Sequence, residues 1–237
     1  MSPGPLALVG GDELKAGNEP QDRVLAAAAD GGPAFVLATA AARQGPATAV
    51  RNAQRWFLQF GLDVQELPVL QPAEAESPEV AARAAGGRFF YLVGGDPGHT
   101  VGVLRGSAVW AAIADAWRGG AALGGSSAGA MALGEWSLVR EAWPNRSSRR
   151  YADALGLVRG VAVLPHFQSF GGKWVDSAQA SAPREDVTLL GVDERTAALW
   201  QEGRWRVAGP GKVTVISGSE RRAFEPEEPI EGLPAPG

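Results

Sequence analysis

The amino-acid sequence predicts an α/β fold, a three-layer sandwich in which helices cover both faces of a mostly parallel sheet. Short apolar runs, each closed by Gly, Asp or Pro, alternate with segments of helical periodicity along the first half of the chain. Repetition of that β–α–β pattern is typical of a parallel sheet that is buried on both sides. The chain has 237 residues, enough to bury a full hydrophobic core, and we expect a single domain over residues 1–224.

The first half of the chain contains five apolar runs that we predict to be strands. They occupy residues 6–9, 34–38, 64–67, 88–93 and 121–124. After the second run, Val50, Ala53 and Phe57 recur at the spacing of one helix face, which predicts a helix over about residues 48–60. Sites in folds of this kind lie beyond the C-terminal ends of the strands, so the glycine-rich turns at 94–96 and 124–127 are candidates.

The second half of the chain is less regular. Residues 160–164 and 187–192 are predicted strands, and residues 197–216 are predicted to form short antiparallel strands joined by glycine turns. Residues 141–151, with one Pro, two Ser and three Arg, are predicted to be a loop, and whether it closes over the site is left open. Residues 225–237 are rich in Pro and Glu, which predicts a frayed C-terminal tail.

Composition excludes several classes of protein. A net charge of −4 argues against a nucleic-acid-binding protein, and the absence of Cys excludes disulfides and thiolate mechanisms. Two His residues without Cys do not predict a metal site. No apolar run approaches the length of a membrane span and no signal-peptide pattern opens the chain, so we expect a soluble, cytoplasmic protein.

Ser127 is the candidate nucleophile. It is the third residue of Gly-Ser-Ser-Ala-Gly at 125–129, the G-x-S-x-G pattern of a nucleophile elbow. Small neighbours allow a sharp turn between strand and helix, and the helix N-terminus directs free N–H groups at a developing oxyanion. The bare pattern arises readily by chance in a chain with 32 Gly, so the strand before it and the helix after it carry the prediction.

A nucleophilic serine needs a general base, and the sequence offers only His99 and His166. His166 follows the predicted strand at 160–164, which brings it to the same sheet edge as Ser127. His99 follows another strand and could also approach. We favour His166 and keep His99 as the alternative.

Glu194 is the candidate acid that orients the base, because it follows the predicted strand at 187–192. Asp193 beside it is the competitor, and both could instead be turn residues. The order Ser, His, acid differs from the Ser, acid, His order of α/β-hydrolases. An esterase of that fold would need an acid between Ser127 and His166, and the sequence offers only a few there: Glu135, Glu141 and Asp153.

Several motifs in the same order resemble peptidase family S51, the group that contains cyanophycinase and aspartyl dipeptidase. They are Gly-Gly-Asp at 10–12 and 94–96, the elbow at 124–130, His-Phe at 166–167, Gly-Val-Asp-Glu-Arg-Thr-Ala at 191–197 and the stretch at 207–213. The resemblance implies a fold related to class I glutamine amidotransferases, with a Ser–His–Glu triad and no cofactor. It assigns Ser127 as nucleophile, His166 as base and Glu194 as orienting acid.

The resemblance also implies an oxyanion hole made by the N–H of Ala128 and an N–H from Gly94 or Gly95. The candidate substrate-binding residues are Asp96, Ser126, Gln168, Lys173 and Arg149. Two features depart from cyanophycinases: Pro97 stands where they usually carry Gln, and residues 168–174 lack their arginines.

We therefore expect a serine peptidase that cleaves small or unusual acidic peptides, with β-aspartyl bonds as one candidate, through an acyl-enzyme. A non-catalytic binding or regulatory protein on the same scaffold is the alternative, and a serine esterase is the third. The expected partner is a small peptide substrate, with no nucleic acid and no membrane. A homodimer is left open.

Overall fold

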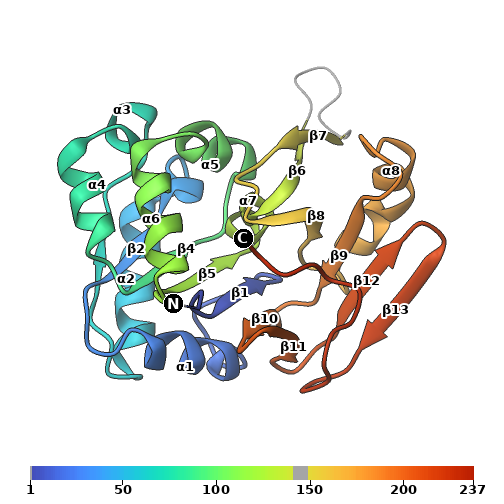
Figure 1. The fold of residues 1–237 in the computed structure, drawn as a ribbon, viewed down its shortest axis with the longest axis horizontal. Helices are drawn as coiled ribbons and strands as arrows, with labels where there is room; N and C mark the ends of the chain where they lie inside the picture. Colours follow the sequence, from blue (N-terminus) through green and yellow to red (C-terminus); the bar gives the residue numbers. More distant parts are fainter. Residues whose placement is uncertain (1, 141–148) are drawn as a thin grey trace.

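The computed structural model describes residues 2–140 and 149–237, whose strands form two sheets flanked by helices (Figure 1). The helices are α1 (Glu19–Ala28), α2 (Pro46–Leu58), α3 (Pro72–Ala75), α4 (Pro78–Ala85), α5 (Pro97–Leu104), α6 (Ala108–Arg118), α7 (Ala128–Leu133) and α8 (Val175–Ala180). Short 3₁₀ helices occupy Thr39–Ala41 and Gly171–Trp174.

The seven-stranded sheet contains the strands predicted in the first half of the chain. Its order is β11 (Arg204–Ala208), β10 (Ala197–Gln201), β1 (Leu6–Val9), β5 (Ala122–Ser126), β4 (Phe89–Leu92), β2 (Ala34–Leu37) and β3 (Val64–Glu66). The five strands from β1 to β3 are parallel, whereas β10 and β11 are antiparallel additions at one edge. The predicted helix at 48–60 is α2, shifted by two residues at each end.

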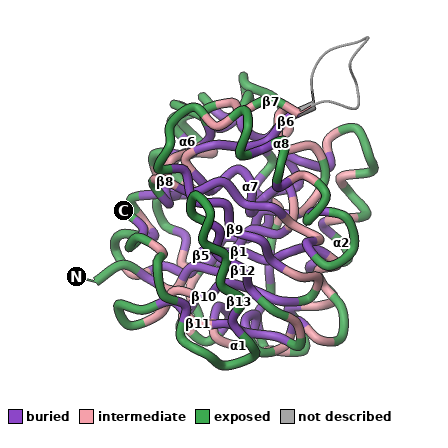
Figure 2. Tube along the Cα trace, turned by 90° about the vertical axis from the view of Figure 1, so that its right-hand side faces the viewer, coloured by how far each residue is buried: buried purple, intermediate pink, exposed green. Residues whose placement is uncertain are grey.

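Helices cover both faces of this sheet, which confirms the layered α/β prediction. Leu6 and Leu8 of β1 face the cluster that contains α6, whereas Ala7 and Val9 face the cluster that contains α1 and α2. Side chains alternate across a strand, so consecutive residues of β1 point to opposite faces of the sheet. Because both faces are covered, every residue of β1 is apolar. Figure 2 shows the buried stretches of β1, β5 and β9 in the interior, with exposed residues around them.

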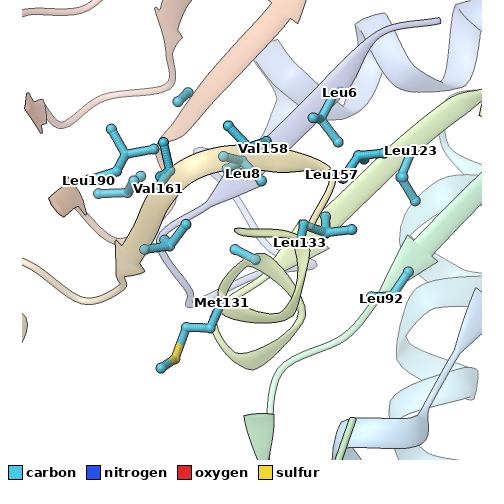
Figure 3. Close-up of a cluster of buried hydrophobic side chains, with 14 of the residues drawn as sticks. Leu6, Leu8, Leu92, Leu123, Met131, Leu133, Leu157, Val158, Val161 and Leu190 are labelled. Atoms are coloured by element: carbon cyan, nitrogen blue, oxygen red, sulfur yellow. The ribbon is translucent and has the colours of Figure 1, made fainter. Parts of the chain in front are cut away.

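A second, six-stranded sheet was not predicted. Its order is β13 (Glu220–Phe224), β12 (Val213–Ser217), β9 (Thr188–Val192), β8 (Val158–Leu164), β6 (Gly134–Arg140) and β7 (Arg149–Asp153). Helix α7 fills the space between the sheets. In Figure 3, Met131 and Leu133 of α7 lie between Leu92 of the first sheet and Val161 of the second, so the two sheets share one apolar core.

Three local predictions differ from the structure. Residues 149–151 belong to β7 rather than to a loop, while 141–148, the rest of that predicted loop, lie outside the described residues. Strand β12 pairs with β9 and β13, not with β11, because it lies in the other sheet. The C-terminal segment is held rather than frayed: Ile230 is buried and its N–H donates to Trp205 O. In the described part of the chain no helix is long and apolar enough to cross a bilayer.

Candidate active site

Ser127 occupies a strained turn between β5 and α7. Its backbone angles, φ 48° and ψ −108°, are rare for a residue with a side chain and fit a nucleophile elbow. Its N–H donates to Val9 O of the neighbouring strand at 2.9 Å. A Cβ on Gly129 would lie 2.3 Å from Leu92 O, and one on Gly125 would lie 2.7 Å from the Gly129 carbonyl carbon, so the turn requires both glycines.

His166 lies directly after β8 and reaches the hydroxyl of the elbow. Its Nε2 is 3.1 Å from Ser127 Oγ, and its N–H donates to Gly10 O at 2.7 Å. The imidazole packs over Gly11, where a Cβ would lie 2.2 Å from the ring, and stacks on Phe170 at 4.9 Å between centroids. The turn after β1 therefore leaves room for the ring, and Phe170 limits its rotation.

Glu194 lies in the crossover from β9 to β10 and contacts the other nitrogen of His166. Its Oε1 is 2.8 Å from His166 Nδ1. A carboxylate only accepts, so Nδ1 carries the hydrogen and Nε2 is left with a lone pair toward Ser127. The Gln168 Oε1 accepts the Glu194 N–H at 3.0 Å, which fixes the turn that presents the carboxylate. Asp193, the competing acid, instead accepts the N–H of Lys212.

His99, the alternative base, is engaged elsewhere. Its Nε2 lies 2.8 Å from Leu70 O, and because a carbonyl only accepts, this nitrogen carries the hydrogen. His99 lines the same cavity as Ser127 but forms no hydrogen bond with it among the described residues. The structure thus brings His166, rather than His99, to the candidate nucleophile.

The N–H groups of the two glycines proposed for the oxyanion hole differ in their hydrogen bonding. The Gly94 N–H donates to Glu13 Oε1 at 2.8 Å, so it is not available to an oxyanion in this arrangement. The N–H groups of Gly95 and Ala128 form no hydrogen bond with any other residue that the structure describes. Gly95 and Ala128 are therefore the remaining candidate donors.

Ser126, a predicted substrate-binding residue, lies in the interior. Its side chain is fully buried and its hydroxyl donates to Glu13 Oε2 at 3.0 Å. Sequence reasoning missed Glu13 altogether. The available signal was its place directly after the Gly-Gly-Asp turn that ends β1.

A cavity of about 720 Å³ opens beside Ser127 and His166. Its apolar wall includes Met131, Leu138 and Phe170, and its charged lining residues are Arg43, Asp96, Arg149 and Arg150. Among the described residues of this lining, cationic side chains therefore outnumber carboxylates. Within the described residues, no three His, Asp or Glu side chains gather as they would to hold a metal ion.

The other predicted substrate-binding residues differ in their relation to this cavity. Asp96 and Arg149 line it, and the Arg149 guanidinium lies 4.8 Å from the Trp174 ring centre. The Asp96 carboxylate also accepts the His99 N–H, which caps α5. Gln168 and Lys173 do not line the cavity. The sequence did not indicate Arg43, which reaches it from the turn before α2.

Comparison with known proteins matches residues 6–208 to the model of peptidase family S51. A cyanophycinase of Trichormus variabilis is 30% identical over 223 residues, covering 91% of this chain and 74% of its own. A cyanophycinase of Synechococcus elongatus is 32% identical over 164 residues, covering 65% and 50%.

Among solved structures, a peptidase from an acI-B1 actinobacterium has a TM-score of 0.83 and 28% identity, with 96% of each chain covered. A Listeria monocytogenes protein, at 16% identity and a TM-score of 0.56 over 94% of this chain and 99% of its own, shares the fold. With a family model that spans most of both sheets, the chain belongs to peptidase family S51 and is a peptidase.

Proposed function

We propose that this peptidase is of the serine type and hydrolyses small acidic peptides through an acyl-enzyme. The observation that carries the proposal is the continuous chain of hydrogen bonds from Ser127 Oγ to His166 Nε2, and from His166 Nδ1 to Glu194 Oε1. A nucleophile, a base and an orienting acid in this sequence of contacts are what acyl transfer by serine requires.

In the proposed mechanism, His166 Nε2 removes the proton of Ser127 while Oγ attacks the peptide carbonyl carbon. The negative charge that develops on the carbonyl oxygen is held by the N–H groups of Gly95 and Ala128. The imidazolium, stabilised by Glu194, gives its proton to the departing amine as the C–N bond breaks. A water molecule, deprotonated by the same nitrogen, then attacks the acyl-enzyme, and the released proton returns to Ser127.

The charges of the cavity favour an acidic substrate. In the part of the chain that the structure describes, Arg43, Arg149 and Arg150 line it together with one carboxylate, Asp96. Arginine binds carboxylates in a bidentate geometry. A volume of about 720 Å³ suits a peptide of a few residues. The same charges would repel the arginine side chains of cyanophycin, so we expect weak or no activity on that polymer despite the similarity to cyanophycinases.

The proposal is tested by labelling with a fluorophosphonate, followed by mass spectrometry of the modified peptide. We expect labelling at Ser127 and none in Ser127→Ala. Failure to label the wild-type protein would favour the binding-protein alternative, and labelling that persists in Ser127→Ala would refute the assigned nucleophile.

Substrate class is tested separately with a panel of dipeptides that includes acidic, basic and β-aspartyl members. We expect the acidic peptides to be cleaved with the highest kcat/KM, and this preference to fall when Arg43 and Arg150 are changed together to Gln. Efficient release of products from cyanophycin, or a preference for basic peptides, would contradict the reading of the cavity.

A further inference from the structure

The carboxylate of Glu13 connects two backbone segments that flank the candidate nucleophile. Its Oε1 accepts the Gly94 N–H at 2.8 Å, and its Oε2 accepts the Ser126 hydroxyl at 3.0 Å. Glu13 follows β1, Gly94 follows β4, and Ser126 is the last residue of β5, the strand between them. One side chain therefore joins the C-terminal ends of three adjacent parallel strands.

The segment after β4 is held on both sides of Gly95. Gly94 is bound to Glu13, and the Asp96 N–H donates to Ala40 O at 2.8 Å. Gly95 itself has φ 145°, and a Cβ there would lie 2.2 Å from Ala40 O, so only glycine fits. The direction of the Gly95 N–H is thus set by two fixed neighbours rather than by a bond of its own.

The segment after β5 is held in the same way. The Ser126 hydroxyl is bound to Glu13, and the Ser127 N–H donates to Val9 O. The next N–H along the chain is that of Ala128, the first residue of α7. A Cβ on Gly94 would lie 3.3 Å from Ser127 Cβ, so the two segments are in close contact where Glu13 joins them.

We propose that Glu13 is a positioning residue that sets the distance between the two oxyanion-hole donors, Gly95 N–H and Ala128 N–H. This proposal rests on the serine-peptidase function proposed above. Glu13 does not line the cavity, so it acts through the backbone and not through the substrate. Without it, the Gly94 N–H and the buried Ser126 hydroxyl lose their acceptor, and both segments must move to find another.

The test measures the rate constant with which diisopropyl fluorophosphate modifies Ser127, since charge also develops on the phosphoryl oxygen in that reaction. We expect Glu13→Ala to lower it roughly 10–100-fold, below the ~10²–10³-fold loss typical of deleting a donor outright. Glu13→Gln offers one acceptor oxygen and an amide that can donate to Ser126, so it should stay within about threefold of wild type. Glu13→Asp keeps the charge but is too short to reach both partners, and should resemble Glu13→Ala.

The matched control is Glu19→Ala, which removes a carboxylate that also accepts a backbone N–H, that of Gly17, but lies outside the site. Its labelling rate should equal that of wild type. The pH dependence of labelling should keep its shape in all Glu13 variants, because His166 and Glu194 are untouched, whereas a disturbed base would shift it.

The positioning role would be overturned if Glu13→Asp were labelled at the wild-type rate, or if Glu13→Gln lost as much of the labelling rate as Glu13→Asp. These two variants decide the question even if Glu13→Ala does not fold. If wild-type Ser127 itself is not labelled, the proposed function is refuted, and the positioning role falls with it. A labelled wild type with unaffected Glu13 variants refutes the positioning role alone.

Discussion

The buried carboxyl of Asp22 should make the protein less stable as the pH rises, and Asp22→Asn should remove that dependence. Asp22 is fully buried in α1, and its one hydrogen-bonded oxygen accepts the Trp56 Nε1–H at 2.7 Å. Its Oδ1 has no partner among the described residues. Burial raises the pKa of Asp22 from 3.8 to about 8, and the nearby carboxylates of Glu13 and Glu19 add to the effect.

The sign follows from proton binding. In the unfolded chain Asp22 loses its proton near pH 4, whereas the folded protein keeps it until about pH 8. Between those values the folded state binds more protons, so the stability present below pH 4 is lost progressively as the pH rises and levels off above about pH 8. Each pH unit is worth about 1.4 kcal/mol, which gives roughly 3–4 kcal/mol between pH 5 and pH 8.

The assay is urea unfolding of wild type and Asp22→Asn at pH 5, 6, 7 and 8, followed by circular dichroism. Because other ionisable groups contribute nearly equally to both proteins, the difference in unfolding free energy isolates Asp22. We expect that difference to move in favour of Asp22→Asn by about 1 kcal/mol or more per pH unit. The exposed Asp30→Asn should give a difference that is flat with pH. A flat difference for Asp22→Asn as well would refute the argument.

Three further outcomes follow from the site. Most turnover on a cleaved dipeptide should be lost in Ser127→Ala and also in His166→Ala. The double variant should lose little more activity than either single variant, because the effects of residues that act as one unit are not additive. Additive losses of activity would contradict this. Glu194→Gln should lower turnover less than His166→Ala does, because the imidazole keeps its place beside Ser127 when only its orienting carboxylate is lost; an equal loss in the two variants would argue against this division of roles. Gly129→Ala should lower the free energy of unfolding by at least about 2 kcal/mol, measured by thermal unfolding, because the added methyl group clashes with the β4 backbone. Gly102 is a helical position with open space around it, so Gly102→Ala should raise the free energy of unfolding by about 0.5–1 kcal/mol. Equal changes in stability for the two variants would refute the packing argument.

The parallel half of the fold was predictable because its signals are local. The strands β1, β2, β4 and β5 are short runs buried on both faces, whereas in the edge strand β3 only Val64 is buried. The structure places all five strands within two residues of the predicted bounds. The second sheet was not predictable in the same way. Nothing in the residues of β12 says that it pairs with β9 rather than with β11, because the pairing is decided by the packing of the two sheets.

The candidate site shows the same division. Ser127 carries a local motif, and His166 and Glu194 could be chosen because His is scarce and both residues follow strands. Glu13 and Arg43 come close to the candidate site only in the folded chain: Glu13 follows the Gly-Gly-Asp motif without being part of it, and Arg43 lies in a turn without a motif. The burial of Ser126 could not be predicted for the complementary reason: the motif that marks its neighbour says nothing about which way an adjacent side chain points.

The candidate site lies where the two sheets meet, and the chain crosses between them at its key residues. Ser127 follows β5 of the seven-stranded sheet, whereas His166 follows β8 of the six-stranded sheet. Glu194 lies in the crossover from β9 to β10, which belong to different sheets. The turn after β1 links these parts through backbone bonds, in which Gly10 O accepts the His166 N–H and Gly11 O accepts the Arg195 N–H.

The distance from Ser127 Oγ to His166 Nε2 therefore depends on how the sheets pack, and not on either sheet alone. The apolar cluster around α7 fixes that packing, since side chains from both sheets contact it (Figure 3). A reaction in which misplacement by about 1 Å can cost 100-fold in rate needs such a rigid junction. The short helix that follows the candidate nucleophile fits this requirement, because every residue of α7 is buried and the helix packs against strands of both sheets.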